Sequence, residues 1–285
     1  MVSVLSVFFL GVEMPELPEV ETTMRGIEPH LVGQKIAKID IRQPQLRWLI
    51  TPELSQDILG QEVVQVSRRG KYIGVHTAKG TMIIHLGMSG SLYFVPANTP
   101  PLFHDHVDFQ IAGVDQWLRY TDPRRFGAIL WTTEDWLQHD LLSHLGPEPL
   151  SNAFDLDYFY AKAKGRKVPI KTFVMDSKVV VGVGNIYANE ALFMAGIRPT
   201  RMAGNISKVR MRKLLECIKI VLANAIKQGG TTLKDFVGGD GKPGYFKQEL
   251  AVYGRAGLPC TQCQQVLTEV RQAQRSTVYC AKCQT

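Results

Sequence analysis

The chain has 285 residues, and 45% of them are hydrophobic, which is enough to bury a good core in two medium domains. It carries no evident repeat or low-complexity tract, so a solenoid or a largely unstructured chain is excluded. The 33 basic residues against 26 acidic ones give a net charge of +7, which suits a polyanionic partner but is also common in ordinary proteins.

Residues 1–13 form a separate stretch. Val2–Val12 is apolar, but no basic residue precedes it and no small-x-small cleavage site follows it. It is also too short to span a bilayer, so we expect no membrane association. We expect translation to start at Met14, with residues 1–13 a non-native or mis-annotated extension; a targeting signal is the alternative.

The stretch Met14–Glu21 reads Met-Pro-Glu-Leu-Pro-Glu-Val-Glu. If Pro15 begins the chain, its nitrogen is a secondary amine of pKa near ~7.7–8.0, which is partly unprotonated at neutral pH. Such an amine attacking a sugar C1′ gives an iminium that remains an electron sink for later elimination, with Glu16 placed to shuttle protons. The alternative interpretation is a proline-rich helix entry, because Pro18 and Glu19 both suit a first helical turn.

A helix ending near Gly33 is followed by short β-rich runs, whose spacing predicts a β-sandwich or barrel. The expected strands are Lys35–Ile41, Val63–Arg68, Tyr72–His76, Met82–Leu86, Ser91–Val95, His106–Ile111, Trp117–Thr121 and Ala128–Thr132. Trp136–Asn152 predicts a short helix and then a linker. Further helices are expected at Leu156–Lys164, Ile170–Met175, Ile186–Ala195 and Lys208–Gln228.

Three stretches of the first domain contain candidate functional residues. Arg68–Tyr72 places three cations beside a glycine, and the alternative is a solvated strand end. His85–Gly90 is a glycine-flanked turn that leaves Met88 no obvious core face, although a core methionine is the commoner case. Tyr120–Gly127 offers an aromatic ring beside a guanidinium, a pair that can enter a base stack; an ordinary ion-paired turn is the alternative.

The second domain opens with a basic run that suits phosphate tracking, or equally a solvated charged face. Its members are Lys162, Lys164, Arg166, Lys167, Lys171 and Lys178. Val181–Tyr187 leads two glycines into a helix, so backbone N–H groups and the Asn185 side chain are candidates to hold a phosphate. Glycine-rich segments at 229–232 and 238–244 indicate a mobile lid or a mere connector.

Four of the five cysteines form two Cys-x-x-Cys pairs near the C-terminus. They are Cys260 and Cys263, then Cys280 and Cys283. This spacing predicts one structural Zn²⁺ held by four thiolates on a β-hairpin in a reducing compartment. Because the coordination shell would be closed, the metal should hold the hairpin together while polar residues such as Arg275 at its tip touch the ligand.

Together these motifs resemble those of bacterial formamidopyrimidine-DNA glycosylase. The matching stretches are Met14–Glu21, His85–Gly90, Asp122–Gly127, Gly182–Tyr187, Gly241–Phe246 and the terminal zinc finger. The resemblance implies a base-excision repair enzyme that removes oxidised purines such as 8-oxoguanine and formamidopyrimidines through a proline Schiff base. It then cleaves the strand by β,δ-elimination. The implied partner is double-stranded DNA with oxidised purines or abasic sites, bound by a cytoplasmic, nucleoid-associated monomer.

The resemblance also implies residue roles. Pro15 would be the Schiff-base nucleophile and Glu16 the proton donor to the sugar. Lys71 would donate a proton in β-elimination, and Arg275 would do so in δ-elimination. Side chains that fill the gap left by the flipped nucleotide, or that contact DNA, would be Met88, Arg124, Phe126, His104, Arg166 and Asn185, while Lys71 would also hold a phosphate.

The implied fold class is α+β with two domains: an N-terminal β-sandwich with a flanking helix, and a C-terminal helix-two-turn-helix module with a β-hairpin zinc finger. We expect the sandwich at 14–145, a linker at 146–160, the helical module at 161–249 and the finger at 250–285. DNA would lie in the cleft between the domains.

Two alternatives remain. Endonuclease VIII shares this fold and the N-terminal proline but prefers oxidised pyrimidines. Leu17, where that family usually has glycine, and the Met88, Arg124 and Phe126 set argue against it. The other alternative is a damaged-DNA-binding protein in which catalysis is lost because Pro15 stays blocked.

Overall fold

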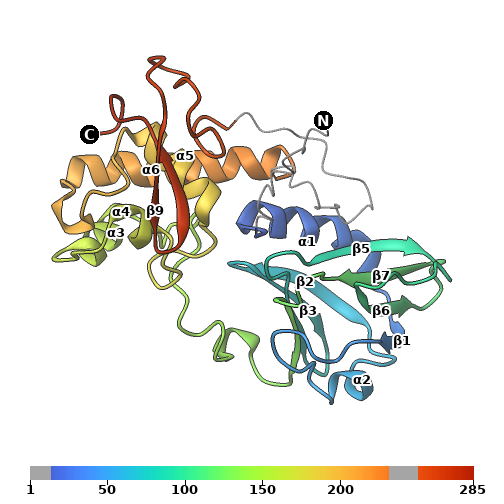
Figure 1. The fold of residues 1–285 in the computed structure, drawn as a ribbon. Coiled ribbons are helices and arrows are strands. Elements are labelled where there is room, and N and C mark those ends of the chain that lie inside the picture. Colours follow the sequence, from blue (N-terminus) through green and yellow to red (C-terminus); the bar gives the residue numbers. More distant parts are fainter. Residues whose placement is uncertain (1–13, 231–249) are drawn as a thin grey trace, which may run out of the picture.

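The computed structural model describes residues 14–230 and 250–285. The predictions for residues 1–13, for the glycine-rich segment 238–244 and for the motif Gly241–Phe246 lie outside the described residues. Two domains are visible, a β-rich one and a helical one that carries the C-terminal hairpin (Figure 1).

The first domain is a sandwich of two antiparallel four-stranded sheets, with strand orders β1-β6-β7-β5 and β2-β3-β4-β8 (Figure 1). The strands are β1 Ile36–Ile41, β2 Val63–Arg69, β3 Tyr72–Thr77, β4 Thr81–His85, β5 Ser91–Pro96, β6 Asp105–Ile111, β7 Gln116–Thr121 and β8 Ala128–Thr132. These bounds differ from the expected ones by at most one residue at either end. Apolar side chains of both sheets, such as Ile73, Ile84, Leu92 and Phe109, form one buried core between them. The predicted β-sandwich is therefore confirmed.

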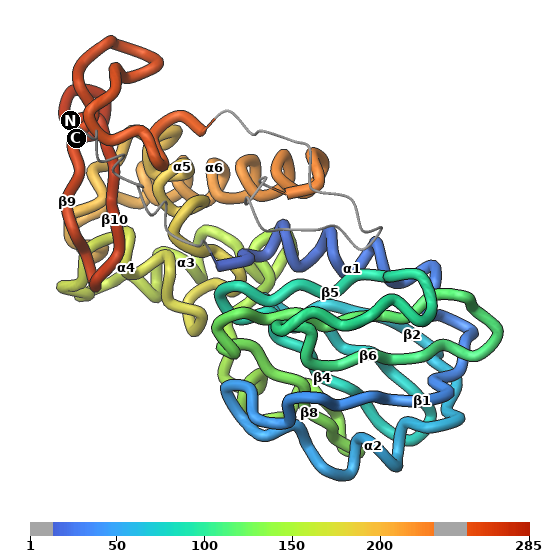
Figure 2. The backbone as a smooth tube through the Cα atoms, turned by 45° about the vertical axis from the view of Figure 1, so that its right-hand side comes forward, coloured from blue at the N-terminus to red at the C-terminus, as the bar shows by residue number. Residues whose placement is uncertain are grey.

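Helix α1, Leu17–Leu31, joins the two domains. Pro18 favours its first turn, and Val20, Ile27 and Leu31 form the buried stripe that helical spacing predicts. The helix contacts β2 and β5 of the sandwich and α6 of the second domain, and Figure 2 shows it between them. The N-terminal end of α1 therefore lies where the two domains meet.

The second domain contains the helices that the sequence predicts. They are α3 Leu156–Ala163, α4 Ile170–Val174, α5 Asn185–Ala195 and α6 Lys208–Lys227. Their apolar faces form a second buried core, separate from that of the sandwich. The short helix expected after Trp136 is only the 3₁₀ turn η1, Trp136–Gln138. The short elements α2, Leu54–Asp57, and η2, Ala203–Asn205, were not predicted, because four residues or fewer carry no helical period.

The C-terminal segment forms the predicted β-hairpin from β9, Thr268–Gln272, and β10, Arg275–Tyr279. Its turn consists of Ala273 and Gln274, whose positive φ angles of 47° and 63° are those a tight hairpin turn requires. A small core that includes Cys260 and Cys280 packs beneath the hairpin. Within the described ranges 14–230 and 250–285, no helix is long and apolar enough to cross a membrane.

Candidate active site

A cavity of about 520 Å³ lies between the two domains, at the N-terminal end of α1. Five of the predicted site residues line it: Glu16, Lys71, Met88, Asn185 and Arg275. Pro15 is buried beside it, between Met14 and Glu16, which both line the cavity. The tertiary structure thus brings together residues that are far apart in the sequence.

The carboxylate of Glu16 extends from the first domain to the second. It accepts hydrogen bonds from the backbone N–H groups of Gly184 (2.7 Å) and Ile186 (2.8 Å) at the start of α5. The residue is 3% exposed, and burial raises the pKa of Glu16 to about 7, although the Lys71 ammonium opposes the rise. Near neutral pH this carboxyl group is therefore partly protonated and able to donate a proton into the cavity.

A second buried carboxylate, Glu19, holds Glu16 in place. One oxygen of Glu19 accepts a hydrogen bond from the backbone N–H of Glu16 (2.9 Å), and the other accepts one from the hydroxyl of Tyr187 (2.6 Å). The sequence indicated Glu19 only as a favourable residue for a first helical turn. Its contact with Tyr187 crosses the domain boundary, and no local pattern carries that signal.

Lys71 lies in the two-residue turn between β2 and β3, and it is partly buried. Glu148 fastens this turn to the linker: it accepts a hydrogen bond from the backbone N–H of Gly70 (2.7 Å) and pairs with Arg68 (2.9 Å) and Arg69 (3.1 Å). The alternative of a solvated strand end is therefore wrong. Burial lowers the pKa of Lys71, while nearby carboxylates oppose the change.

Arg275 is the first residue of β10 and is exposed at the hairpin tip. It lines the cavity that also contains Glu16 and Lys71, and in addition a neighbouring cavity of about 300 Å³. Arg166, exposed between α3 and α4, lines only the neighbouring cavity.

Lys171 departs from the phosphate-tracking role expected of its basic run. It is 1% exposed, and its Nζ donates to the backbone carbonyl of Ser276 (2.7 Å) and to Oγ1 of Thr277 (2.7 Å), both in β10. Burial, assisted by the positive charge of Arg275, lowers the pKa of Lys171 to about 7. This residue anchors the hairpin to α4, whereas the other members of the run are exposed: Lys162, Lys164, Arg166, Lys167 and Lys178.

The residues expected to fill the gap left by a flipped nucleotide lie on two turns of the sandwich. Met88 follows β4 and lines both the 520 Å³ cavity and an adjoining one of about 590 Å³. Arg124 and Phe126, between β7 and β8, line the second of these. The guanidinium carbon of Arg124 lies 4.8 Å from the centroid of the Phe126 ring, and both side chains are exposed.

His104 does not line the 520 Å³ cavity. It is partly buried just before β6, and its backbone carbonyl accepts a hydrogen bond from the N–H of Asp122 (3.1 Å). The structure therefore connects His104 to the Arg124 turn through the backbone.

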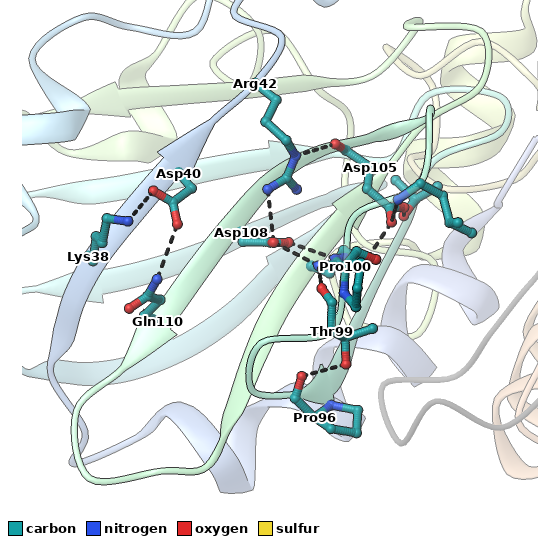
Figure 3. Close-up of polar contacts among 12 residues, drawn as sticks. Lys38, Asp40, Arg42, Pro96, Thr99, Pro100, Asp105, Asp108 and Gln110 are labelled. Carbon is teal, nitrogen blue, oxygen red and sulfur yellow. Dashed lines mark hydrogen bonds and ion pairs between the residues drawn. The ribbon is translucent and has the colours of Figure 1, made fainter.

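A buried ion-pair network holds the loop at 97–104 (Figure 3). Arg119 is 2% exposed and pairs with Asp105 (3.1 Å) and Asp108 (2.8 Å). Its guanidinium also donates to the backbone carbonyl of Thr99 (2.8 Å). The loop is thus fixed by hydrogen bonds, although much of its surface is exposed.

The glycine-led turn before α5 does not leave its backbone N–H groups open to a phosphate. The N–H groups of Gly184, Ile186 and Tyr187 point at the Glu16 carboxylate, at 2.7, 2.8 and 3.5 Å. For these three N–H groups the prediction is wrong, because the Glu16 carboxylate takes the place expected for a phosphate. Asn185 differs, because its Oδ1 is buried and accepts no hydrogen bond from the described residues.

Family profiles match three parts of the chain: the formamidopyrimidine-DNA glycosylase N-terminal domain at 14–129, the helix-two-turn-helix domain of the same enzymes at 145–237, and the zinc finger found in them and in isoleucyl-tRNA synthetases at 257–285. The chain belongs to the formamidopyrimidine-DNA glycosylase family. The member from Marinomonas sp. is 76% identical over 272 residues, which cover 95% of this chain and all of that protein.

Solved structures agree with this assignment. The crystal structure of the family member MutM (Fpg) from Thermus thermophilus is 36% identical, with a TM-score of 0.84 over 95% of this chain and 98% of that one. A complex of wild-type Lactococcus lactis Fpg with DNA containing N7-benzyl-Fapy-dG is 33% identical, with a TM-score of 0.87 over 95% of this chain and all of that one. The predicted two-domain α+β fold of the family is thereby confirmed.

The family's zinc finger has its four ligands in place here. The Sγ atoms of Cys260, Cys263, Cys280 and Cys283 all lie within 4.8 Å of one another. Tetrahedral Zn²⁺ with Zn–S bonds of about 2.3 Å places the sulfurs about 3.8 Å apart, and the pairs Cys263–Cys280 and Cys260–Cys283 measure 3.5 and 3.9 Å. Backbone N–H groups also approach two of the sulfurs. The prediction of one structural zinc site is confirmed.

Proposed function

We propose that this protein is a bifunctional DNA glycosylase and AP lyase that removes oxidised purines, including 8-oxoguanine and formamidopyrimidines, from double-stranded DNA in the bacterial cytoplasm. The observation that carries the proposal is the single cavity in which Glu16, Lys71 and Arg275 converge beside Pro15. The names of its relatives support the substrate class.

Glycosylase chemistry begins at Pro15. Its nitrogen lone pair forms a bond to the sugar C1′ and the bond from C1′ to the base breaks, so that the proton lost by the Pro15 nitrogen balances the one that the departing base takes up. Glu16 gives a proton to the ring oxygen, so that the sugar opens and an iminium remains on Pro15. A pKa of about 7 for Glu16 supports this role, because an ordinary carboxylic acid would have lost its proton at neutral pH.

Strand cleavage then uses the two cations of the cavity. In β-elimination water takes a proton from C2′, the electron pair of that bond forms a double bond as the C3′–O bond breaks, and the Lys71 ammonium gives a proton to the departing phosphate. Arg275 serves in the same way in δ-elimination, which breaks the C5′–O bond. The lowered pKa of Lys71 supports its role, since a lysine whose pKa is nearer neutral exchanges protons more readily.

Flipping the damaged nucleotide leaves a gap in the duplex, which Met88, Arg124 and Phe126 fill. Two of these side chains are exposed on the sandwich, and Met88 reaches the catalytic cavity. The Asn185 side chain lines that cavity, and its NH₂ group can donate a hydrogen bond to a phosphate neighbouring the lesion. We place His104 and Arg166 among the more distant DNA contacts. We retain the domain limits stated above except at the linker, because Phe154 and Phe159 of 146–160 belong to the core of the helical domain.

An endonuclease VIII-like preference for oxidised pyrimidines is the second candidate. Leu17 argues against it, because this side chain is fully buried and packs so closely on Gly182 that a Cβ there would overlap it. The contact between α1 and the turn before α5 is therefore built around a leucine at this position.

Borohydride trapping tests the proposal. Zinc-loaded protein that begins at Pro15 is mixed with duplexes containing 8-oxoguanine opposite cytosine, thymine glycol, or no lesion. We expect a covalent adduct with the 8-oxoguanine duplex above all. The matched control is the same protein with Met14 retained, in which the Pro15 nitrogen is a tertiary amide without useful basicity, so no adduct is expected.

Each other outcome has a defined meaning. Preferential trapping by thymine glycol would favour the endonuclease VIII-like alternative, and no adduct with either lesion would contradict the proline mechanism. An adduct formed equally well with Met14 retained would point to another amine that lines the cavity, either the α-amino group of Met14 or the Lys71 side chain. Affinity for the duplex should also fall steeply with salt, since phosphate contacts release counterions.

A further inference from the structure

The carboxylate of Asp122 contacts both turns that carry the gap-filling side chains. Asp122 is fully buried at the end of β7. Its Oδ1 accepts a hydrogen bond from the hydroxyl of Ser89 (2.7 Å), next to Met88, and its Oδ2 accepts one from the backbone N–H of Gly127 (2.8 Å), next to Phe126. One carboxylate thus bridges the Met88 turn and the Phe126 turn.

Ser89 links the same two turns a second time. While its hydroxyl donates to Asp122, its Oγ accepts a hydrogen bond from the backbone N–H of Arg124 (3.1 Å). The same N–H also approaches Asp122 Oδ1 at 3.3 Å. The position of the Arg124 backbone is therefore set by Ser89 and Asp122 together.

The two turns also touch through their backbones. Gly87 has a φ of +68°, and a Cβ at this position would overlap the backbone of Phe126 and Gly127. Beneath them, the hydroxyl of the buried Tyr120 lies 3.3 Å from Asp122 Oδ2 and 3.3 Å from the backbone carbonyl of His85. Because no side chain separates the turns, a shift of one must move the other.

We infer that Asp122 is a positioning residue that locks the Met88 turn and the Arg124–Phe126 turn into one rigid wedge. The inference rests on the proposed function, in which these side chains enter the base stack, and adds the residue that keeps them in register. Asp122 lines none of the three cavities described above, so it acts through the turns and not on the substrate.

The proposed role predicts which of the two reactions, base excision or strand nicking, the loss of Asp122 will slow. Base extrusion needs Met88 and Phe126 to enter the stack together, since neither alone fills the gap of a whole nucleotide. An abasic site needs no base extrusion, so its cleavage depends on the catalytic cavity alone. Uncoupled turns should therefore slow excision and spare nicking.

The test compares Asp122→Asn and Ser89→Ala with the wild-type protein. An asparagine retains one acceptor oxygen but presents an NH₂ group either to the Gly127 N–H or to the Arg124 N–H, so one turn loses its partner. Ser89→Ala removes the hydrogen bond of the Ser89 hydroxyl to Asp122 and the one that it accepts from the Arg124 N–H, while the Asp122 carboxylate keeps its contacts with the Gly127 and Arg124 N–H groups. This variant serves if Asp122→Asn does not fold. Leu54→Ala is the destabilised control, because Leu54 is fully buried in α2, in a part of the sandwich that contributes no residue to the three cavities.

Three measurements are made on each variant: single-turnover excision of 8-oxoguanine, nicking of a pre-formed abasic site, and the fluorescence rise of 2-aminopurine beside the lesion. We expect excision and the fluorescence rise to slow by about tenfold or more in Asp122→Asn, and by less in Ser89→Ala. Nicking should stay within about threefold of wild type in both. Leu54→Ala should slow excision and nicking equally, if at all.

A double variant separates this inference from the proposed function. If Asp122 acts through the wedge, Asp122→Asn should cost much less in a Met88→Ala, Phe126→Ala background than in the wild type. Full additivity, or equal losses of excision and nicking in Asp122→Asn and Ser89→Ala, would overturn the inference. If Met88→Ala and Phe126→Ala do not slow excision, these side chains do not fill the gap. The proposed function is then contradicted, and not the inference about Asp122.

Discussion

The carboxylate of Glu16 occupies the space in front of Gly184 that a side chain at that position would need. A Cβ on Gly184 would overlap the Glu16 carboxyl group, which the Gly184 N–H holds at 2.7 Å. The glycine that precedes α5 is therefore required by a residue of the other domain. The same contact points the carboxyl group into the interdomain cavity and keeps it buried.

Gly184→Ala should displace Glu16 from the N-terminal end of α5. We expect excision of 8-oxoguanine to fall by about 10²-fold, because the proton donor loses its position. Single-turnover excision on duplex DNA provides the measurement. Gly257→Ala is the control, since a Cβ at Gly257 meets no atom within 4 Å and only the backbone strain of a positive φ is added. Equal losses in both variants would contradict this account.

The pH dependence of excision should be bell-shaped. The acid limb reflects protonation of the Pro15 amine, whose pKa lies near ~7.7–8.0 in an unperturbed chain end. The alkaline limb reflects loss of the Glu16 proton, because burial raises the pKa of Glu16 to about 7. Since this pKa lies below that of the amine, the fraction of protein with both groups in the required state peaks between the two values, and activity falls only above about 8. The optimum should thus lie between about 7 and about 8.

Glu16→Gln tests the assignment of the alkaline limb. Excision should fall by about 10²–10⁴-fold, and the remaining activity should no longer decline as pH rises above about 8. Nicking of a pre-formed abasic site should suffer less, because its open-chain aldehyde needs no ring opening. An unchanged alkaline limb in this variant would show that another group titrates there.

Loss of the metal should affect the hairpin more than the rest of the fold. We expect one zinc per chain by elemental analysis, and Cys280→Ser should lose zinc, DNA binding and strand cleavage while most of the helical circular dichroism remains. Cys217→Ser is the control, because Cys217 is buried in α6 away from the four-cysteine cluster. If Cys280→Ser bound lesion DNA normally, the finger would not contact DNA.

Lys171 should make the free energy of unfolding depend on pH. An unfolded chain keeps the lysine proton up to about 10.5, whereas burial lowers the folded-state pKa of Lys171 to about 7. Between these values the unfolded state binds more protons, so the free energy of unfolding contributed by this group rises with pH. Lys171→Met should lack that rise and should also loosen β10, which carries Arg275.

Denaturant unfolding of the zinc-loaded protein at about pH 7 and about pH 9 measures this difference. Lys162→Met is the matched control, since Lys162 is exposed in α3. The difference between the two pH values should shrink in Lys171→Met and not in Lys162→Met. An identical rise in the wild type and both variants would place the titration elsewhere.

Local patterns in the sequence determined the secondary structure, the zinc ligands and the family. Alternating apolar residues separated by glycine and proline gave the strands of the sandwich to within one residue, because turn and strand preferences act over a few positions. The spacing of Cys260, Cys263, Cys280 and Cys283 predicted the zinc site for the same reason: metal ligands must be close in space, and paired cysteines on a hairpin already are. The motif stretches identified the family.

Only the tertiary structure decided the environment of the site residues. The pKa of Glu16 depends on burial between domains and on the backbone N–H of Gly184, which lies 168 residues further along the chain, directly before α5. Lys171 was grouped with exposed lysines because the composition of a segment does not show which way each side chain points. Docking of the hairpin nevertheless buries its ammonium group. Asp122 likewise reads as an ordinary turn residue until two separate turns are seen to share its carboxylate. Burial and electrostatics are properties of the packed chain, so no local pattern determines them.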